Sequence, residues 1–191
     1  VGVRYCTNGK FGLERDMSID VRSPLTNDKL PFLHWFSDAS LNIPSVSGGV
    51  GMLAGGAVYA GSRREHLSAP DSHTGEVVAA GNNFNQLVPV AGVAQELHIQ
   101  LGAPVPFYLD SMTTVFVITA DTAIKRSAWL LRRVMVLEEG VSQGLIEPIH
   151  INEYDMVADP FTKYLVLHVW RRLQHYAGNW RGALPARVTA H

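Results

Sequence analysis

The sequence predicts an α/β fold in which helices flank a mixed five-stranded sheet. Three strand-like runs come first in the chain, two later strand-like runs each follow a helical segment, and no internal repeat is present. Consecutive strands pair as an antiparallel meander, and a strand that follows a crossover helix runs parallel to its neighbour. We therefore expect the spatial order 3-2-1-4-5, with the first three strands antiparallel and helices on both faces.

The strands are expected at apolar runs that end in turn-forming residues. Residues 30–37 are apolar and aromatic and lead directly into Asp38. Residues 48–53 and 57–63 flank the pair Gly55-Gly56, which suits the positive φ angles of a tight hairpin turn. Residues 105–109 and 146–152 supply the fourth and fifth strands, and a further short strand is expected near residues 3–6.

Helices are indicated by capping residues and by apolar residues at helical spacing. Asp71 and Ser72 are good N-caps for a helix that begins near residue 74, is kinked or split at Pro89 and resumes to about residue 99. Residues 111–120 form the next helix. The clearest helix covers residues 127–141, where apolar residues recur at i, i+4, i+7 and i+11, and Gly144 ends it. Residues 156–162 are a short helix or turn, and residues 164–176 form the last helix.

Composition limits the class of protein. Hydrophobic residues make up 47% of the 191 residues, which excludes disorder for most of the chain, and a single cysteine excludes a disulfide framework. The net charge of −1 argues against a free-standing, non-specific nucleic-acid binder. It is compatible with a nuclease held on its substrate by a larger protein, and the absence of an initiator Met suggests a fragment of one. No membrane span or signal peptide is expected.

We divide the chain into a connector at residues 1–29, a catalytic domain at residues 30–177 and a flexible tail at residues 178–191.

Four acids of the central domain stand at its predicted strand ends. Asp38 and Asp110 end two strands that we expect to be parallel neighbours, Glu76 lies in the first turn of the helix after the meander, and Asp159 follows the last strand. Clustered carboxylates repel one another and need protons or hard cations. Two Mg²⁺ ions held by such a cluster can catalyse phosphoryl transfer. The alternative is that each acid only caps a turn.

At these positions the sequence resembles the ribonuclease H domain of copia-type LTR-retrotransposon polyproteins. The resemblance rests on an ordered set of motifs between residues 1 and 176. They are Phe36-Ser37-Asp38-Ala39-Ser40, Ser47-Gly48-Gly49-Val50, Ser72-His73-Thr74-Gly75-Glu76, Phe107-Tyr108-Leu109-Asp110-Ser111 and Ala158-Asp159-Pro160-Phe161-Thr162-Lys163. The last of them is the most specific. Thr74 departs from the family, which usually has a second Glu at this position.

The resemblance implies a ribonuclease H-like fold and cleavage of the RNA strand of RNA–DNA hybrids. It assigns Asp38, Glu76, Asp110 and Asp159 as catalytic residues that bind two Mg²⁺ ions, for which Mn²⁺ would substitute. The implied partners are the hybrid itself and the reverse transcriptase domain of the same polyprotein. The implied location is a retroelement particle in the cytoplasm, with the nucleus as the alternative.

Substrate contacts are expected from two further groups of residues. Small polar side chains beside the acids are candidates for reading the 2′-OH that distinguishes RNA from DNA: Ser40, Asn42, Ser72 and Ser111. Two basic pairs at and within one helix are candidates for a cationic edge that holds the DNA strand: Lys125-Arg126 and Arg132-Arg133. The alternative for the polar group is a role in caps and turns, and for the basic pairs a role as solvated surface residues.

Two other functions stay open at this point. Ribonuclease H-like folds can lose catalysis and serve as connector or interaction domains, because fold does not fix function. A different metal-dependent nuclease or an integrase-like enzyme would use a similar set of acids. The roles of His73, one helical turn before Glu76, and of His150 are also left open.

Overall fold

The computed structural model describes residues 33–177, except residues 42, 55, 66–68, 100, 102–103 and 121–127. Several predictions lie outside the described residues. These are the short strand near residues 3–6, the connector 1–29, the tail 178–191, and the substrate-binding candidates Asn42, Lys125 and Arg126.

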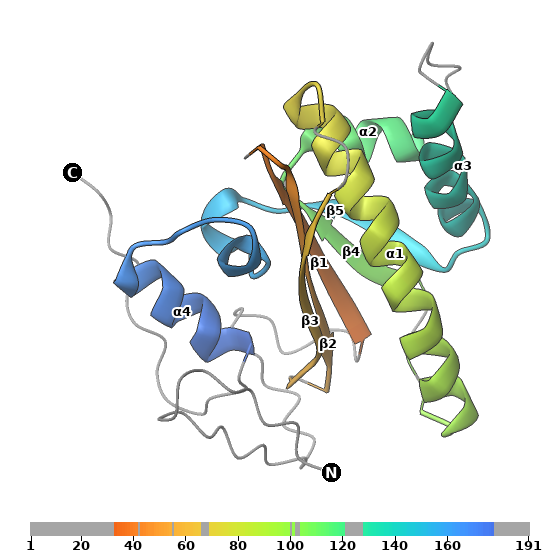
Figure 1. Cartoon of the computed structure of the whole chain (residues 1–191). Coiled ribbons are helices and arrows are strands. Elements are labelled where there is room, and N and C mark those ends of the chain that lie inside the picture. The colour runs from red at the N-terminus through yellow and green to blue at the C-terminus, as the bar shows by residue number, and fades with distance from the viewer. Residues whose placement is uncertain are drawn as a thin grey trace.

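A single mixed sheet of five strands forms the centre of the molecule (Figure 1). Its strands are β1 (Leu33–Ser40), β2 (Val46–Leu53), β3 (Gly56–Arg64), β4 (Val105–Leu109) and β5 (Ile146–His150). They lie in the order β3-β2-β1-β4-β5. Strands β1 to β3 pair antiparallel, whereas β4 runs parallel to β1 and β5 runs parallel to β4. The predicted order and strand directions are confirmed.

Helices cover both faces of this sheet. On one side lie α1 (Ser72–Glu96), α2 (Met112–Thr119) and α3 (Ala128–Ser142), and on the other lies α4 (Leu167–Ala177) (Figure 1). Two short 3₁₀ turns, η1 (Glu153–Asp155) and η2 (Asp159–Phe161), connect β5 to α4. Among the described residues, no helix combines the length and the apolar character that a membrane crossing requires.

The two faces of the sheet have separate hydrophobic cores, because side chains alternate along a strand. Trp35 on β1 is fully buried in the core that also contains Phe84 of α1 and Leu137 of α3. The next residue, Phe36, is equally buried but belongs to the opposite core, together with Ala158 beside η2. Asp38 has the same parity as Phe36, so the alternation directs its side chain to the face that η2 covers.

Three local expectations need correction. Strand β1 does not end at Asp38 but continues to Ser40, because β2 pairs with it along its full length. In the hairpin Ala54 has a positive φ angle of 50° and Gly56 already belongs to β3, while Gly55 lies outside the described residues. Helix α1 continues through Pro89 without a break and ends at Glu96. Pro89 and Asn85, whose carbonyl loses its usual N–H partner there, are both exposed, so water can take the missing hydrogen bond.

A candidate metal centre of buried carboxylates

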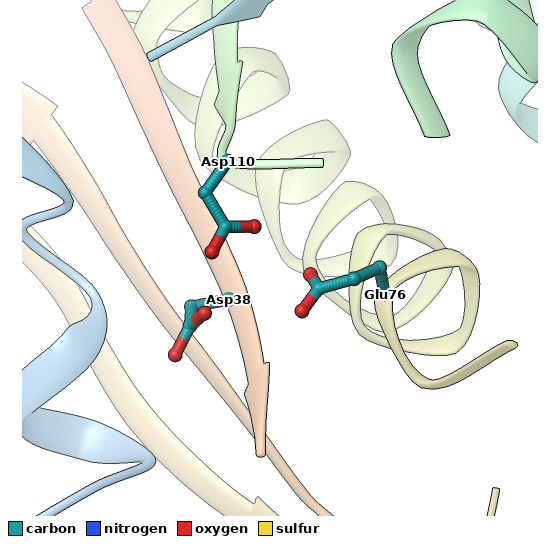
Figure 2. A group of neighbouring side chains, drawn as sticks. All are labelled: Asp38, Glu76 and Asp110. Atoms are coloured by element: carbon teal, nitrogen blue, oxygen red, sulfur yellow. The ribbon is translucent and has the colours of Figure 1, made fainter. Parts of the chain in front are cut away.

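Three of the four predicted acids share one small space. Asp38 lies on β1 and Asp110 directly follows β4, and the parallel register pairs the residues just before them, Ser37 and Leu109. Glu76 approaches from α1, so the three carboxylates meet at one place (Figure 2). One carboxylate oxygen from each residue lies within 4.8 Å of the others. The topology therefore brings together residues that are up to 72 positions apart in the chain.

The carboxylates of Asp38 and Glu76 are buried and that of Asp110 is half-buried, and each has one buried oxygen atom without a hydrogen bond from the residues that the structure describes. Asp38 is 0% exposed and Glu76 is 5% exposed. In the described part of the chain, Asp38 Oδ1, Glu76 Oε2 and Asp110 Oδ1 accept no hydrogen bond. A buried ionised carboxylate is stable only when it is paired or coordinates a metal ion. Oxygen atoms are the ligands that hard divalent cations such as Mg²⁺ take, so this donor set fits such an ion.

The electrostatics of the site lead to the same conclusion. Burial raises the pKa of Asp38 from 3.8 to about 7, although the Lys163 ammonium and a hydrogen bond from Thr162 oppose the shift. Burial raises the pKa of Glu76 to about 9, and the nearby charges of Asp110 and Asp38 add to the effect. The pKa of Asp110 is also raised, first by burial. Without a cation, the site therefore favours protonated carboxyl groups, and a divalent ion would shift them to the charged form.

The fourth predicted acid, Asp159, lies beside this group rather than within it. It is the first residue of η2 and is 4% exposed. Its Oδ1 accepts a hydrogen bond from Lys163 Nζ at 3.0 Å, and the same Nζ lies 3.6 Å from Asp38 Oδ1. Burial raises the pKa of Asp159, and the hydrogen bond and charge of Lys163 oppose the shift. Asp159 thus reaches Asp38 through a lysine.

The close approach of η2 to the sheet depends on a glycine. Gly48 on β2 is paired with Asp38 on β1. A Cβ atom on Gly48 would lie 2.5 Å from Cγ2 of Thr162 and 3.1 Å from the carbonyl oxygen of Ala158. Because Gly48 has no side chain, the Thr162 hydroxyl reaches Asp38 and donates a hydrogen bond to its Oδ2. The site therefore includes a contact that only a glycine at this position allows.

Helix α1 presents Glu76 to the sheet, and a buried polar network fixes the helix. Asn83 lies seven residues after Glu76, two helical turns further on the same face. Its Nδ2 donates to Ser37 Oγ at 3.0 Å and to the carbonyl oxygen of Gly48 at 2.9 Å. Its Oδ1 accepts a hydrogen bond from Trp35 Nε1 at 3.3 Å. Asn83 thereby ties α1 to β1, which carries Asp38, and to the neighbouring strand β2.

The N-terminal cap of α1 explains why Thr74 can stand where the family that the sequence resembles usually has a second Glu. The side chain of Asp71 caps the helix and accepts hydrogen bonds from the Thr74 backbone N–H at 2.7 Å and from its hydroxyl at 3.0 Å. Thr74 is therefore part of the cap and adds no carboxylate to the site. The predicted N-cap Asp71 is confirmed, and the helix begins at Ser72.

Sequence reasoning gave no role to Thr162, Lys163, Gly48 or Asn83. Two of them carried a spacing signal, because Lys163 is four residues after Asp159 and Asn83 is seven residues after Glu76. Such spacing places side chains on one side of a helical turn. Gly48 belongs to one of the motifs that carry the resemblance, but that motif does not indicate that Gly48 makes room for an element more than 100 residues away.

The predicted substrate-binding residues lie in different surroundings. Ser40 is 7% exposed, whereas Ser72 is exposed as the first residue of α1. Ser111 caps α2, where its Oγ accepts a hydrogen bond from the Thr114 N–H at 3.2 Å. This observation matches the alternative interpretation of Ser111 as a cap. His73, the histidine before Glu76, lies with its Nδ1 3.5 Å from the hydroxyl of Thr114.

The two arginines of α3 differ from each other. Arg132 is exposed to solvent, and Arg133 is half-buried. Arg133 lines a cavity of about 200 Å³ together with Arg63 of β3. Ala39 and Gly75, the chain neighbours of Asp38 and Glu76, line the same cavity. Two arginines and Glu65 thus line a cavity that is bounded by the chain neighbours of Asp38 and Glu76.

Known proteins resemble this chain in structure. A scan against protein-family models and a search of curated proteins both find no match. The N-terminal RNase H domain of a Mycobacterium tuberculosis protein, solved as a fusion with maltose-binding protein, gives a TM-score of 0.53 at 12% identity, over 70% of this chain and 91% of that one. LC11-RNase H1, isolated from compost by a metagenomic approach, gives a TM-score of 0.53 at 13% identity, over 70% of this chain and 94% of that one. The same enzyme in complex with an RNA/DNA hybrid gives a TM-score of 0.50 at 12% identity, over 68% of this chain and 93% of that one.

These similarities define the class of fold. Together with the strand order β3-β2-β1-β4-β5 and helices on both faces, they show that the chain has a ribonuclease H-like fold. At 12–13% identity they define no more than the fold. The chemistry must be argued from the site itself.

Proposed function

We propose that this protein is a metal-dependent endoribonuclease that hydrolyses the RNA strand of RNA–DNA hybrids. One observation carries the proposal. Asp38, Glu76 and Asp110 converge where the parallel strands β1 and β4 carry their acids, and each has a buried oxygen atom that accepts no hydrogen bond from the described residues. Active sites of open α/β sheets form at this edge. The complex of LC11-RNase H1 with an RNA/DNA hybrid supports the choice of substrate class.

Mg²⁺ is the proposed cofactor, with Mn²⁺ as a substitute. Asp38, Glu76 and Asp110 would hold one ion, and Asp38 with Asp159 would contribute to a second during the reaction. Bound Mg²⁺ supplies the positive charge that stabilises the transferring phosphoryl group and the attacking water. The protein holds the carboxylates in one place and excludes water from them. Their raised pKa values mean that binding of an ion is coupled to release of protons.

Substrate binding is proposed to use the residues around this centre. A contact with the 2′-OH would come from the small polar residues next to the acids, Ser40, Asn42, Ser72 and Ser111. The DNA strand would lie along α3, where Arg132 and Arg133 offer positive charge together with Lys125 and Arg126. The cavity that Arg63 and Arg133 share supports this placement, because it adjoins the residues that precede Glu76 and follow Asp38.

We further propose that the chain acts within a retroelement polyprotein, next to a reverse transcriptase domain. The support is the ordered set of motifs shared with the ribonuclease H domains of copia-type elements. A net charge of −1 gives a weak electrostatic attraction to an anionic duplex, so a partner domain would provide much of the binding. A retroelement particle in the cytoplasm is the corresponding location.

The proposal is tested by cleavage of three labelled duplexes at low salt: an RNA–DNA hybrid, duplex DNA and duplex RNA. We expect cleavage of the hybrid alone, only with Mg²⁺ or Mn²⁺, and strongly reduced when the ribonucleotide at the cut carries hydrogen in place of its 2′-OH. Equal cleavage of duplex DNA would show a different nuclease. Divalent-ion binding without any cleavage, with the chain tested alone and joined to a reverse transcriptase, would show a connector domain.

Asp110→Asn is the central variant, and Asp71→Asn is its matched control. Both remove one negative charge, but Asp71 caps α1 and Asn caps a helix equally well. We expect Asp110→Asn to abolish cleavage and to reduce the rise in Tm on addition of Mg²⁺, whereas Asp71→Asn keeps both. Unchanged cleavage in Asp110→Asn would remove this residue from the mechanism.

A further inference from the structure

Lys163 places a positive charge inside the group of acids. Its Nζ lies 3.0 Å from Asp159 Oδ1 and 3.6 Å from Asp38 Oδ1, and its side chain is 31% exposed. One ammonium group is thus shared by two carboxylates that come from different elements of the fold. An ammonium group is a compact point charge, so it can stand between two carboxylates much as a small cation does.

The four acids therefore form two unequal positions. Asp38, Glu76 and Asp110 each bring one carboxylate oxygen to within 4.8 Å of the others, and each has one oxygen atom that accepts no hydrogen bond in the described part of the chain. Between Asp38 and Asp159, in contrast, the ammonium of Lys163 already supplies one positive charge. The first position calls for an external cation, whereas the second has a cation that belongs to the chain.

The local backbone holds Lys163 in this place. The N–H of Lys163 donates to the carbonyl oxygen of Asp159 at 3.0 Å, which closes one helical turn at the end of η2. The side chain of Lys163 then lies over Asp159, four residues earlier. The preceding residue, Thr162, binds the other oxygen of Asp38. Both oxygen atoms of Asp38 thus face one short segment of the chain.

We propose that the Lys163 ammonium is a built-in cation that occupies the space between Asp38 and Asp159 until substrate arrives, so that the substrate-free protein binds one divalent ion, at Asp38, Glu76 and Asp110. This inference rests on the proposed metal-dependent activity. A second ion competes with the ammonium for the same two carboxylates, because two positive charges in such proximity repel. The flexible four-carbon stem of lysine allows the ammonium to leave when substrate phosphate and the second ion enter.

Counting bound Mn²⁺ ions in the absence of nucleic acid tests the inference, by calorimetry and by the spin resonance of free Mn²⁺. Lys163→Met keeps an unbranched side chain one atom shorter and removes its charge, and Lys163→Arg keeps the charge. We expect one ion per chain in the parent protein and in Lys163→Arg, and two ions per chain in Lys163→Met. In the double variant Lys163→Met/Asp159→Asn the count should return to one, because the second position loses a carboxylate.

A second readout uses folding stability and separates this role from a purely structural ion pair. Without Lys163 the charges of Asp38 and Asp159 are uncompensated, so Lys163→Met should have a lower Tm than the parent and a larger rise in Tm with Mn²⁺. A purely structural ion pair predicts the lower Tm without the larger rise. Lys163→Gln, which can still donate to Asp159, serves if Lys163→Met does not fold.

The possible results distinguish the inference from the proposed function. One ion in both the parent and Lys163→Met, with equal affinity, would overturn the inference and leave the proposed metal centre intact. Two ions in the substrate-free parent would also overturn it. No ion in the parent but binding in Lys163→Met would also overturn the inference, because the parent is expected to bind one ion. No ion in either protein would overturn both the inference and the proposed metal centre.

Discussion

Gly48 lies directly opposite Asp38 in the register of β1 and β2, and a side chain at Gly48 would collide with the turn that brings Asp159 and Lys163 to the site. The neighbours of this missing Cβ include the carbonyl oxygen of Ala158 and Cβ of Phe161, both at 3.1 Å. These are backbone or backbone-proximal atoms that cannot rotate away. The distance between η2 and the sheet is therefore set by the absence of one side chain.

Replacing Gly48 should push η2, which carries Asp159, away from the sheet, which carries Asp38. We expect Gly48→Ala to lower the free energy of unfolding by about 1–3 kcal/mol, as overpacking usually does, and to reduce cleavage further than the lost stability explains. Urea unfolding and activity at a temperature where the variant stays folded measure the two effects. Gly92→Ala is the control, since a Cβ at Gly92 meets nothing within 4 Å and the helix should gain up to about 1 kcal/mol. Full activity in Gly48→Ala would show that η2 tolerates displacement.

Asn83 should be needed for the orientation of Glu76. Asn83→Ala leaves buried groups such as Trp35 Nε1 and Ser37 Oγ without their partner, at a cost of about 1–3 kcal/mol for each unsatisfied group. We expect a clear fall in the free energy of unfolding and a smaller rise in Tm on addition of Mg²⁺. Asn85→Ala, on the exposed side of the same helix, should change stability by less than about 0.5 kcal/mol. A normal response to Mg²⁺ in Asn83→Ala would show that Glu76 keeps its place without this network.

The stability of the metal-free protein should fall as the pH rises. The folded-state pKa of Asp38 is raised from 3.8 to about 7 and that of Glu76 from 4.5 to about 9. At a pH between the unfolded-state pKa and the folded-state pKa of such a group, the folded state holds more protons than the unfolded state. The free energy of unfolding therefore decreases with increasing pH. The decrease approaches about 1.4 kcal/mol per pH unit for each group that differs in protonation.

Urea unfolding between about pH 5 and pH 9 with a chelator present measures this dependence. Glu76→Gln should flatten the curve above pH 7, because the group with the higher pKa is gone. Mg²⁺ should raise stability most at the alkaline end, where the carboxylates are charged and need a cation. Stability that is constant or increases over this range in the chelated parent would contradict the raised pKa values.

Hybrid binding should depend on the arginines of α3. In the inactive Asp110→Asn background, we expect Arg132→Ala/Arg133→Ala to bind more weakly and to reduce the slope of log K against log salt by roughly 0.9 for each phosphate that these arginines neutralise in the parent. Arg171→Ala is the control, since this exposed arginine belongs to α4 on the other side of the sheet (Figure 1). A slope equal to that of the parent in the double variant would move the path of the substrate away from α3.

Much of the fold could be predicted because it depends on local patterns. The strand Val105–Leu109 has its predicted bounds, and the helix Ala128–Ser142 extends one residue beyond its predicted end, while its predicted first residue, 127, lies outside the described residues. Alternating and helical spacing of apolar residues is a property of neighbouring positions, so it can be read along the chain. Pro89 shows the limit, because whether a proline ends a helix depends on the exposure of the carbonyl that loses its partner.

The acids of the site could also be predicted, because strand topology alone brings Asp38 and Asp110 to adjacent parallel strands. What the sequence determined by itself is thus the order of the elements and the identity of the acids that they carry. Only the tertiary structure decided which acids converge on one another and which acid is linked to them through a lysine. Asp38, Glu76 and Asp110 converge, each with an oxygen atom that accepts no hydrogen bond within the described ranges, whereas Asp159 is joined to Asp38 by Lys163. The physical reason is that this division depends on contacts across more than 100 residues, through a gap that exists because Gly48 has no side chain.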